Sequence, residues 1–350
     1  MMSELLVTIG SSPVFSLVVK ATMLLGTGLL ISALAWRARA AVRHLVMASM
    51  FAALFALPVA RMVAPIIELP VVVDARSIAP ANPTMGVALG SVARKVPLGE
   101  VLAQAWTIPR LLHAVRNWSS IDFTIESIAT MAWVVWTAGA LMLLAPLVAG
   151  AWRFGRLRRR ALPCVALQHL TGRLAAEARI RRPVDVVCHE RVSSPLTCGF
   201  RRPAIVLPLD VGTWPSEDVR RALVHELEHV RRGDWIVQIA ARAVCALYWF
   251  HPLAWAAWRQ LCLEAERACD DAVVRTAERA DYADQLVLLA RRSGASAPLA
   301  LGMARRSDLA ARVTALLDDR RRRGRAGLRS IATSGVSTAI LVATLAPVQT

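Results

Sequence analysis

Four apolar stretches divide the chain, and each is long enough, or nearly so, to cross a membrane as a helix. They cover residues 14–36, 44–64, 128–152 and 331–348. About 20 apolar residues in a helix span the hydrocarbon core of a bilayer, so we predict three full spans and a shorter, uncharged fourth. No Lys or Arg precedes the first stretch, which favours an uncleaved anchor over a cleaved signal peptide.

Between the third and fourth apolar stretches the pattern changes to that of a globular domain. Helical periodicity covers residues 163–180, strand-like runs cover 184–189 and 204–207, and amphipathic helices are expected at 282–289 and 309–317. We therefore predict a mainly α membrane protein of about four transmembrane helices, with an α+β domain between the third and the fourth. The expected parts are two membrane helices in residues 1–64, a loop at 65–127, a third helix at 128–152, the domain at 153–329 and a fourth helix at 330–350.

Arginine clusters at the borders of the apolar stretches predict how the chain is oriented. Such clusters follow the first stretch (Arg37, Arg39, Arg43), follow the third (153–160) and precede the fourth (320–323, Arg325, Arg329). Positive residues concentrate in cytoplasmic loops, so we expect both termini and the 65–127 loop outside and the globular domain in the cytoplasm. The protein would then be a multi-pass protein of the inner membrane of a bacterium.

Composition agrees with this picture and limits the partners. The chain is 56% hydrophobic, which is more than an ordinary soluble domain contains. Its formal charge of +17 comes largely from arginines beside the apolar stretches, where membrane orientation and anionic lipid explain them. Because no recognition motif accompanies the charge, we expect membrane lipids as partners and no direct binding of nucleic acid. All six cysteines lie in the predicted cytoplasmic part without CxxC spacing, so we expect reduced thiols.

The segment 216–233 has the pattern of an amphipathic helix that carries two histidines. A start signal at Pro215 and Ser216 and a stop signal at Gly233 bound it. His225 and His229 are four residues apart, so their rings project from one side of the helix and can hold a zinc ion. Glu226 can then accept the proton of an attacking water. The competing interpretation is a chance pattern of solvated residues.

A second stretch offers the third ligand. Glu266 and Asp270 are again four apart on one helix face, so one can bind the metal while the other orients a ligand histidine. Glu264 is a weaker rival for the third ligand. We expect Cys269 to point elsewhere and pack in the core.

The apolar segment 235–258 could pass as a further membrane span, which would separate the two histidines from Glu266. His251-Pro252 indicates a bend instead, because a helix tends to end before proline. About 15 residues lead to the bend and about 14 lead back, so the return helix brings Glu266 level with the histidines. We therefore predict a helical hairpin, whose apolar surface can rest in the membrane interface.

The chain contains HELEHVRRGDW (225–235) followed by EAERACDDAVV (264–274). Together these two stretches resemble the M56 membrane metallopeptidases, the group of the BlaR/MecR antibiotic-sensing signal transducers. The spacing is also similar to the wider gluzincin pattern, HExxH then ExxxD. SSPLTCGFRRPAIVLP (193–208) and RHLVMASMFAALFALP (43–58) are similar to further parts of that family. The resemblance implies one zinc ion, His225, His229 and Glu266 as its ligands, Glu226 as general base, and Asp270 directed at a ligand histidine.

The resemblance implies a zinc endopeptidase that cleaves a cytoplasmic or membrane-proximal protein in signal transduction, such as a transcriptional repressor or the chain itself. The alternatives are a quality-control protease like the M48 group and a catalytically silent scaffold. The sequence ends without the external penicillin-binding domain of the sensor members, so a separate sensor partner is expected if the chain senses antibiotics. The oligomeric state stays open.

Four expectations concern residues around this site. An edge strand beside the histidine helix could pair with an extended substrate, or the strands could be ordinary packing elements. Glu228 is expected to be a solvated charge. Asp234 could contact a ligand or only begin a helix. Tyr282 could donate to a developing oxyanion, although packing is the favoured interpretation.

Overall fold

A computed structural model describes residues 13–63, 67–68, 125–293, 306–345 and 348–349 of the chain. Contacts divide the chain into two compact units, one of residues 1–69 with 139–350 and one of residues 70–138. The loop predicted at 65–127 lies outside the described residues, apart from the short strand β1 and the start of helix α6. The two histidines and Glu266 of the predicted site belong to the first unit.

The predicted apolar stretches all form helices. They are α2 (Pro13–Leu34), α3 (Ala40–Val63), α6 (Ile125–Arg160) and α13 (Leu328–Leu345). Three of them, α2, α3 and α6, are long and apolar enough to cross a membrane, whereas α13 is a shorter apolar helix. The fourth span therefore stays a prediction.

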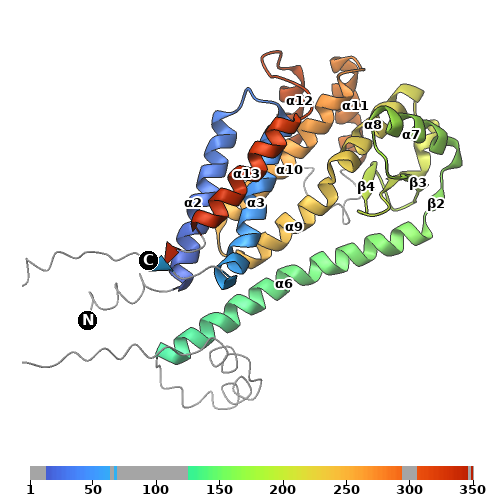
Figure 1. Cartoon of the computed structure of the whole chain (residues 1–350). Helices are drawn as coiled ribbons and strands as arrows, with labels where there is room; N and C mark the ends of the chain where they lie inside the picture. Colours follow the sequence, from blue (N-terminus) through green and yellow to red (C-terminus); the bar gives the residue numbers. More distant parts are fainter. Residues whose placement is uncertain (1–12, 64–66, 69–124, 294–305, 346–347, 350) are drawn as a thin grey trace, which may run out of the picture. The chain divides into compact units, whose positions relative to one another are not determined.

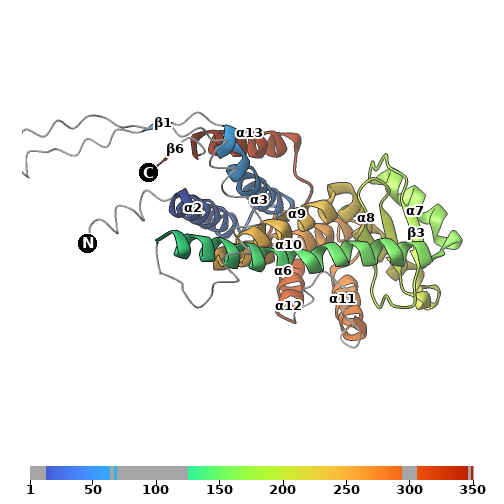
Figure 2. The ribbon, with the colours of Figure 1, turned by 90° about the horizontal axis from the view of Figure 1, so that it is seen from below.

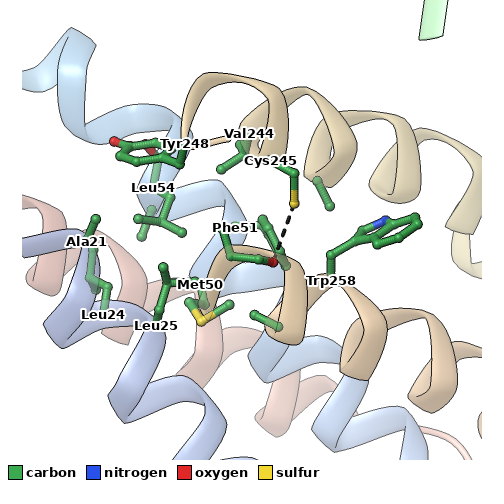
Figure 3. Packing of buried hydrophobic residues seen from close by; sticks show 14 of the residues in the cluster. Ala21, Leu24, Leu25, Met50, Phe51, Leu54, Val244, Cys245, Tyr248 and Trp258 are labelled. Atoms are coloured by element: carbon green, nitrogen blue, oxygen red, sulfur yellow. Dashed lines mark hydrogen bonds between the residues drawn. The ribbon is translucent and has the colours of Figure 1, made fainter. Parts of the chain in front are cut away.

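The segment 235–258 forms the predicted hairpin of two helices, α9 (Asp234–Leu247) and α10 (Pro252–Val273). Pro252 occupies the first turn of α10, where its missing N–H costs no helical hydrogen bond. At the bend, the Cys245 thiol donates to the Ala254 carbonyl at 3.4 Å, which the dashed line in Figure 3 marks. The two helices are thus antiparallel. Glu266 of α10 therefore lies at the same end of the hairpin as the start of α9, next to the histidine segment.

Helix α3 lies among α2, α9, α10 and α13 and contacts all four (Figure 1). Its side chains Met50, Phe51 and Leu54 pack with residues of α2 and of the hairpin, among them Leu25 and Trp258 (Figure 3). A polar contact joins α3 to α13 as well, where the Ser49 and Ser334 hydroxyls are 2.5 Å apart. The hairpin therefore packs against these apolar helices, and neither α9 nor α10 is among the candidate membrane spans of the described residues.

A four-stranded sheet with the order β2-β3-β5-β4 adjoins the histidine helix. Its strands are β2 (Leu162–Pro163), β3 (Asp185–Cys188), β4 (Leu196–Cys198) and β5 (Ala204–Leu207). The two predicted strands are β3 and β5, which pair in parallel at the centre, while β2 and β4 pair antiparallel at the edges. The edge strand β4 contacts α8, the helix that carries the two histidines.

Alternating residues of β5 face two layers, as the twofold period of a strand requires. Ile205 and Leu207 pack with α7 (Val165–Glu177) and α8 (Ser216–Arg232), and Val206 packs with Phe154 and Leu157 of α6. Figure 2 shows the C-terminal end of α6 leading to β3 and α7. The sheet thereby fixes one side of α8.

The remaining elements complete the surroundings of the site. Helices α11 (Arg279–Ser293) and α12 (Arg306–Leu317) pack on each other, and α12 also contacts α10. A 3-10 turn covers Leu209–Thr213, and β1 (Ile67–Glu68) pairs in parallel with β6 (Val348–Gln349). Gly233 ends α8 with φ at 71°, a conformation that glycine adopts without steric cost, and α9 starts at the next residue.

Candidate metal centre

The structure brings His225, His229 and Glu266 together at the meeting of α8 and α10. The Nε2 atom of each histidine lies 3.5 Å from a different carboxylate oxygen of Glu266. Zinc bonds of about 2.0–2.2 Å in a tetrahedral arrangement separate neighbouring ligand atoms by about 3.4 Å. The three side chains therefore fit a zinc ion, as the spacing in the sequence predicts.

Cys269 contributes a fourth candidate donor. Its Sγ atom and one nitrogen of each histidine lie within 4.8 Å of one another, and the residue is wholly buried. The expectation that Cys269 points elsewhere is wrong, because a residue three positions after Glu266 shares its helix face. The two histidines can thus be completed by the carboxylate, by the thiolate, or by both.

Each histidine is oriented by a carboxylate on its other ring nitrogen. The Nδ1 atom of His229 lies 2.7 Å from Oδ2 of Asp234, and Nδ1 of His225 lies 3.3 Å from Oδ1 of Asp270. Tyr282 bridges the second pair, since its hydroxyl lies 3.0 Å from His225 Nδ1 and donates to Asp270 at 2.8 Å. A carboxylate on Nδ1 leaves Nε2 free to bind a metal, which is the usual setting of a ligand histidine.

These contacts decide two of the open expectations. Asp234, the first residue of α9, is 1% exposed and contacts His229 directly. Tyr282 is 2% exposed and its hydroxyl is engaged by His225 and Asp270, so the packing interpretation holds over that of an oxyanion donor.

Arg312 of α12 reaches the site and was not predicted. Its Nε and Nη2 atoms donate to the two oxygens of Asp270 at 2.8 and 2.6 Å, and Nη1 lies 2.9 Å from Glu266 Oε2. Burial alone raises the pKa of Asp270, but Arg312 and His225 outweigh burial and lower that pKa to about 2. The same neighbours hold the pKa of Glu266 well below its usual value despite burial. Both carboxylates are therefore charged at neutral pH.

The charge around the histidines favours a cation. Burial by itself lowers the pKa of His225, but Cys269, Asp270 and Glu266 reverse this and raise the pKa to about 10. The pKa of His229 is raised in the same way, against the effect of burial. The negative groups that stabilise these protons would also stabilise a metal ion, which has to displace the protons in order to bind.

Glu226 is held in place by a residue of the edge strand. Thr197 of β4 donates from its hydroxyl to Glu226 Oε2 at 2.7 Å and lies 3.1 Å from the Glu226 carbonyl oxygen. The Glu226 residue itself is 6% exposed. The carboxylate that would act as base is thus fixed between the helix and the strand along which a substrate could lie.

Two neighbouring glutamates take other roles. Glu264 is wholly buried, and its oxygens accept hydrogen bonds from Arg43, Gln260 and Arg267 at 2.8 to 2.9 Å. Because these three partners engage its carboxylate, Glu264 is less suited than Glu266 to be the third ligand, for which the sequence left it as a rival. The expectation of a solvated Glu228 is wrong, because Glu228 is 4% exposed and ion-paired with two arginines. Those arginines are Arg231 and Arg325.

The site has a histidine pair on one helix and a carboxylate returned by a helical hairpin, beside apolar helices of membrane-spanning length. This is the arrangement expected of a membrane metallopeptidase. The family model described as BlaR1 peptidase M56 matches residues 20–316, and the chain belongs to this M56 family. The resemblance read from the sequence is thereby confirmed.

Curated relatives match a shorter part of the chain. The chain is 30% identical over 173 residues to the regulatory protein BlaR1 of Bacillus licheniformis, a match that covers 47% of this chain and 28% of that protein. It is 20% identical over 163 residues to the methicillin resistance mecR1 proteins of Staphylococcus aureus and Staphylococcus epidermidis, covering 46% of this chain and 28% of theirs.

Proposed function

We propose that the chain is a membrane zinc endopeptidase that cleaves a protein on the cytoplasmic side of a bacterial membrane as a step in signalling. The observation that carries the proposal is the approach of both histidine Nε2 atoms to Glu266, with Glu226 beside them on α8. His225, His229 and Glu266 would hold the ion, and zinc bound there supplies a Lewis acid that polarises a carbonyl and activates water.

The protein side chains divide the remaining work. Asp234 and the pair of Asp270 and Tyr282 keep the two imidazoles in the tautomer that presents Nε2. Glu226 accepts the proton of the attacking water and then delivers it to the leaving amine. Thr197 keeps the Glu226 carboxylate in position through both transfers.

The edge strand supports an extended protein substrate. Among the described residues, β4 pairs with β5 on one side only, and Thr197 joins it to the general base. A peptide added to the free side of β4 would gain main-chain hydrogen bonds and run past Glu226. A repressor-type regulator, or a segment of this chain, is the substrate we propose, because the BlaR1 relative is named a regulatory protein.

Zinc analysis of the full chain, purified in detergent, tests the proposal. We expect about one zinc per chain in the wild type and in Glu226→Ala, and loss of zinc in His229→Ala. His169→Ala is the matched control, because His169 is an exposed histidine on α7 away from the site. A folded wild type without zinc would refute the proposal.

Cleavage is tested in a second step with candidate repressors and unfolded membrane proteins. Wild-type chain should cut, and zinc-loaded Glu226→Ala should not, since it keeps the ion and lacks the base. Bound zinc without cleavage of any substrate would favour the silent scaffold, and cleavage of many unfolded proteins would favour the quality-control protease.

A further inference from the structure

Arg43, near the N-terminal end of α3, joins this membrane helix to α10 close to the metal centre. Its Nε and Nη2 atoms lie 2.9 and 2.6 Å from Oε2 of Glu264, two residues before the proposed carboxylate ligand. The side chains are 3% and 0% exposed, so the ion pair is shielded from water. Nη1 of Arg43 also donates to the Trp36 carbonyl at 3.0 Å in the turn between α2 and α3. One guanidinium thus fixes that turn, α3 and α10 to each other.

His44, the next residue, reaches the other half of the centre. Its buried Nε2 atom lies 3.6 Å from Oδ1 of Asp234, which is a close contact but longer than a hydrogen bond. The second oxygen of Asp234 lies 2.7 Å from His229 Nδ1. Arg232 completes the group, because its Nε donates to Asp234 Oδ1 at 3.1 Å and its Nη2 donates to the Ala265 carbonyl at 2.9 Å. His44 therefore connects α3 to Asp234, which contacts the proposed ligand His229. Through Arg232, the same carboxylate is also connected to the carbonyl of Ala265, the residue before Glu266.

From these two sets of contacts we infer that the N-terminal end of α3 positions the zinc site. Arg43 sets the position of α10 and therefore of Glu266, and His44 sets the carboxylate that orients His229. Helix α3 is also a candidate membrane span and contacts α2, α9, α10 and α13. A displacement of this helix would act on both halves of the ligand set at once. The membrane part would thereby control how tightly the chain holds zinc.

The size of the required displacement is small. Helix shifts of about 1–2 Å are common in switching proteins, and such a shift is enough to break the 2.9 Å hydrogen bond between Arg43 and Glu264. Residues that hydrogen-bond to metal ligands change metal affinity by about 10–100-fold when they are replaced. Arg43 and His44 act one contact further away, through Glu264 and Asp234, so we expect the lower end of that range. The inference rests on the proposed zinc site and adds the element that regulates it.

Zinc affinity, measured by competition with a chelator on the full chain, is the main test. We expect Arg43→Gln and His44→Gln to weaken zinc binding by about tenfold or more, and Arg43→Lys to recover part of the loss because it keeps the charge. Arg37→Gln is the matched control, since Arg37 is an exposed arginine in the same turn. The visible absorption of the cobalt-substituted chain should change in both test variants, because the ligand geometry changes.

Folding is controlled in parallel through the thermal midpoint of the zinc-free chain. If Arg43→Gln does not fold, because it leaves Glu264 charged and buried, the double variant Arg43→Gln with Glu264→Gln replaces it, and His44→Gln decides independently. Variants with wild-type zinc affinity and cobalt spectrum would overturn the inference while the proposed function stands. Weaker zinc binding with an unchanged cobalt spectrum would indicate a purely structural contact and would also overturn it. A wild type that binds no zinc would instead refute the proposed function.

Discussion

Replacement of Asp270 by asparagine tests the hydrogen-bonding network behind His225. The Asp270 carboxylate lies 3.3 Å from the ring nitrogen of His225, accepts from Tyr282 at 2.8 Å and is bound twice by Arg312. Asn has the same shape and keeps one acceptor oxygen, but it loses the negative charge. The change therefore removes the electrostatic part of the interaction and leaves the packing almost unaltered.

The expected loss follows from the strength of these contacts. A hydrogen bond to a charged group is worth about 1.5–3 kcal/mol and one between neutral groups about 0.5–1.5 kcal/mol. Asp270→Asn should therefore cost about 1–1.5 kcal/mol of zinc-binding free energy, which is a factor of about ten in the dissociation constant. The zinc-free chain should also unfold at a lower temperature, since Arg312 loses a charged partner in a site that is only 4% exposed at Asp270.

The assay is chelator competition for zinc, with the neighbouring carboxylate as control. Asp271 is the next residue on α10, but its side chain lies 3.7 Å from Arg323. Asp271→Asn makes the same substitution one position further along the helix, at a side chain that contacts Arg323 and not His225, so its zinc affinity should stay near that of the wild type. Equal affinities in Asp270→Asn, Asp271→Asn and wild type would refute the reasoning that Asp270 acts through His225.

Four further substitutions separate the roles of neighbouring residues. Cys269→Ser should keep zinc within a few-fold of the wild-type affinity, whereas Glu266→Gln should lose it, as measured by metal content after dialysis. Loss of zinc in Cys269→Ser with retention in Glu266→Gln would make the thiolate the third ligand. Thr197→Val should keep zinc but slow cleavage by about tenfold, because Glu226 loses a hydrogen bond to its charged oxygen; an unchanged rate would show that the bond does not matter for the base. Glu228→Gln should lower the thermal midpoint, at a cost of about 1–3 kcal/mol, without changing zinc content, and an unaltered midpoint would contradict the buried ion pair.

Local sequence signals predict the scaffold of the site well. Helix α8 has its apolar period, its start at Ser216 and its stop at Gly233 within the chain itself, so its bounds follow from nearest neighbours. The same holds for the hairpin, because Pro252 forces a bend and equal arm lengths return Glu266 to the histidines. These features depend on backbone geometry, which short stretches of sequence determine.

The residues that complete the site could not be predicted in this way. Arg312 reaches Asp270 across 42 positions of sequence, and His44 reaches Asp234 across a still longer separation. Each is a single polar residue on an otherwise ordinary helix, and only the tertiary fold decides what it faces. The strand β4 has three residues, too few for an alternating pattern, although the stretch around Thr197 carries part of the family resemblance.

The short edge strand also limits which parts of a protein could be cut. Residues inside a helix have their N–H and C=O groups bonded within that helix, so they have none to offer to β4. Only a segment whose backbone groups are unpaired, such as a loop, a tail or a helix that has unwound, could lie along Leu196–Cys198. Because β4 has three residues, it can pair with only a few substrate residues around the bond that is cut. A regulator could therefore be protected or exposed by its own folding, for instance by an ordered loop that unfolds when its partner leaves.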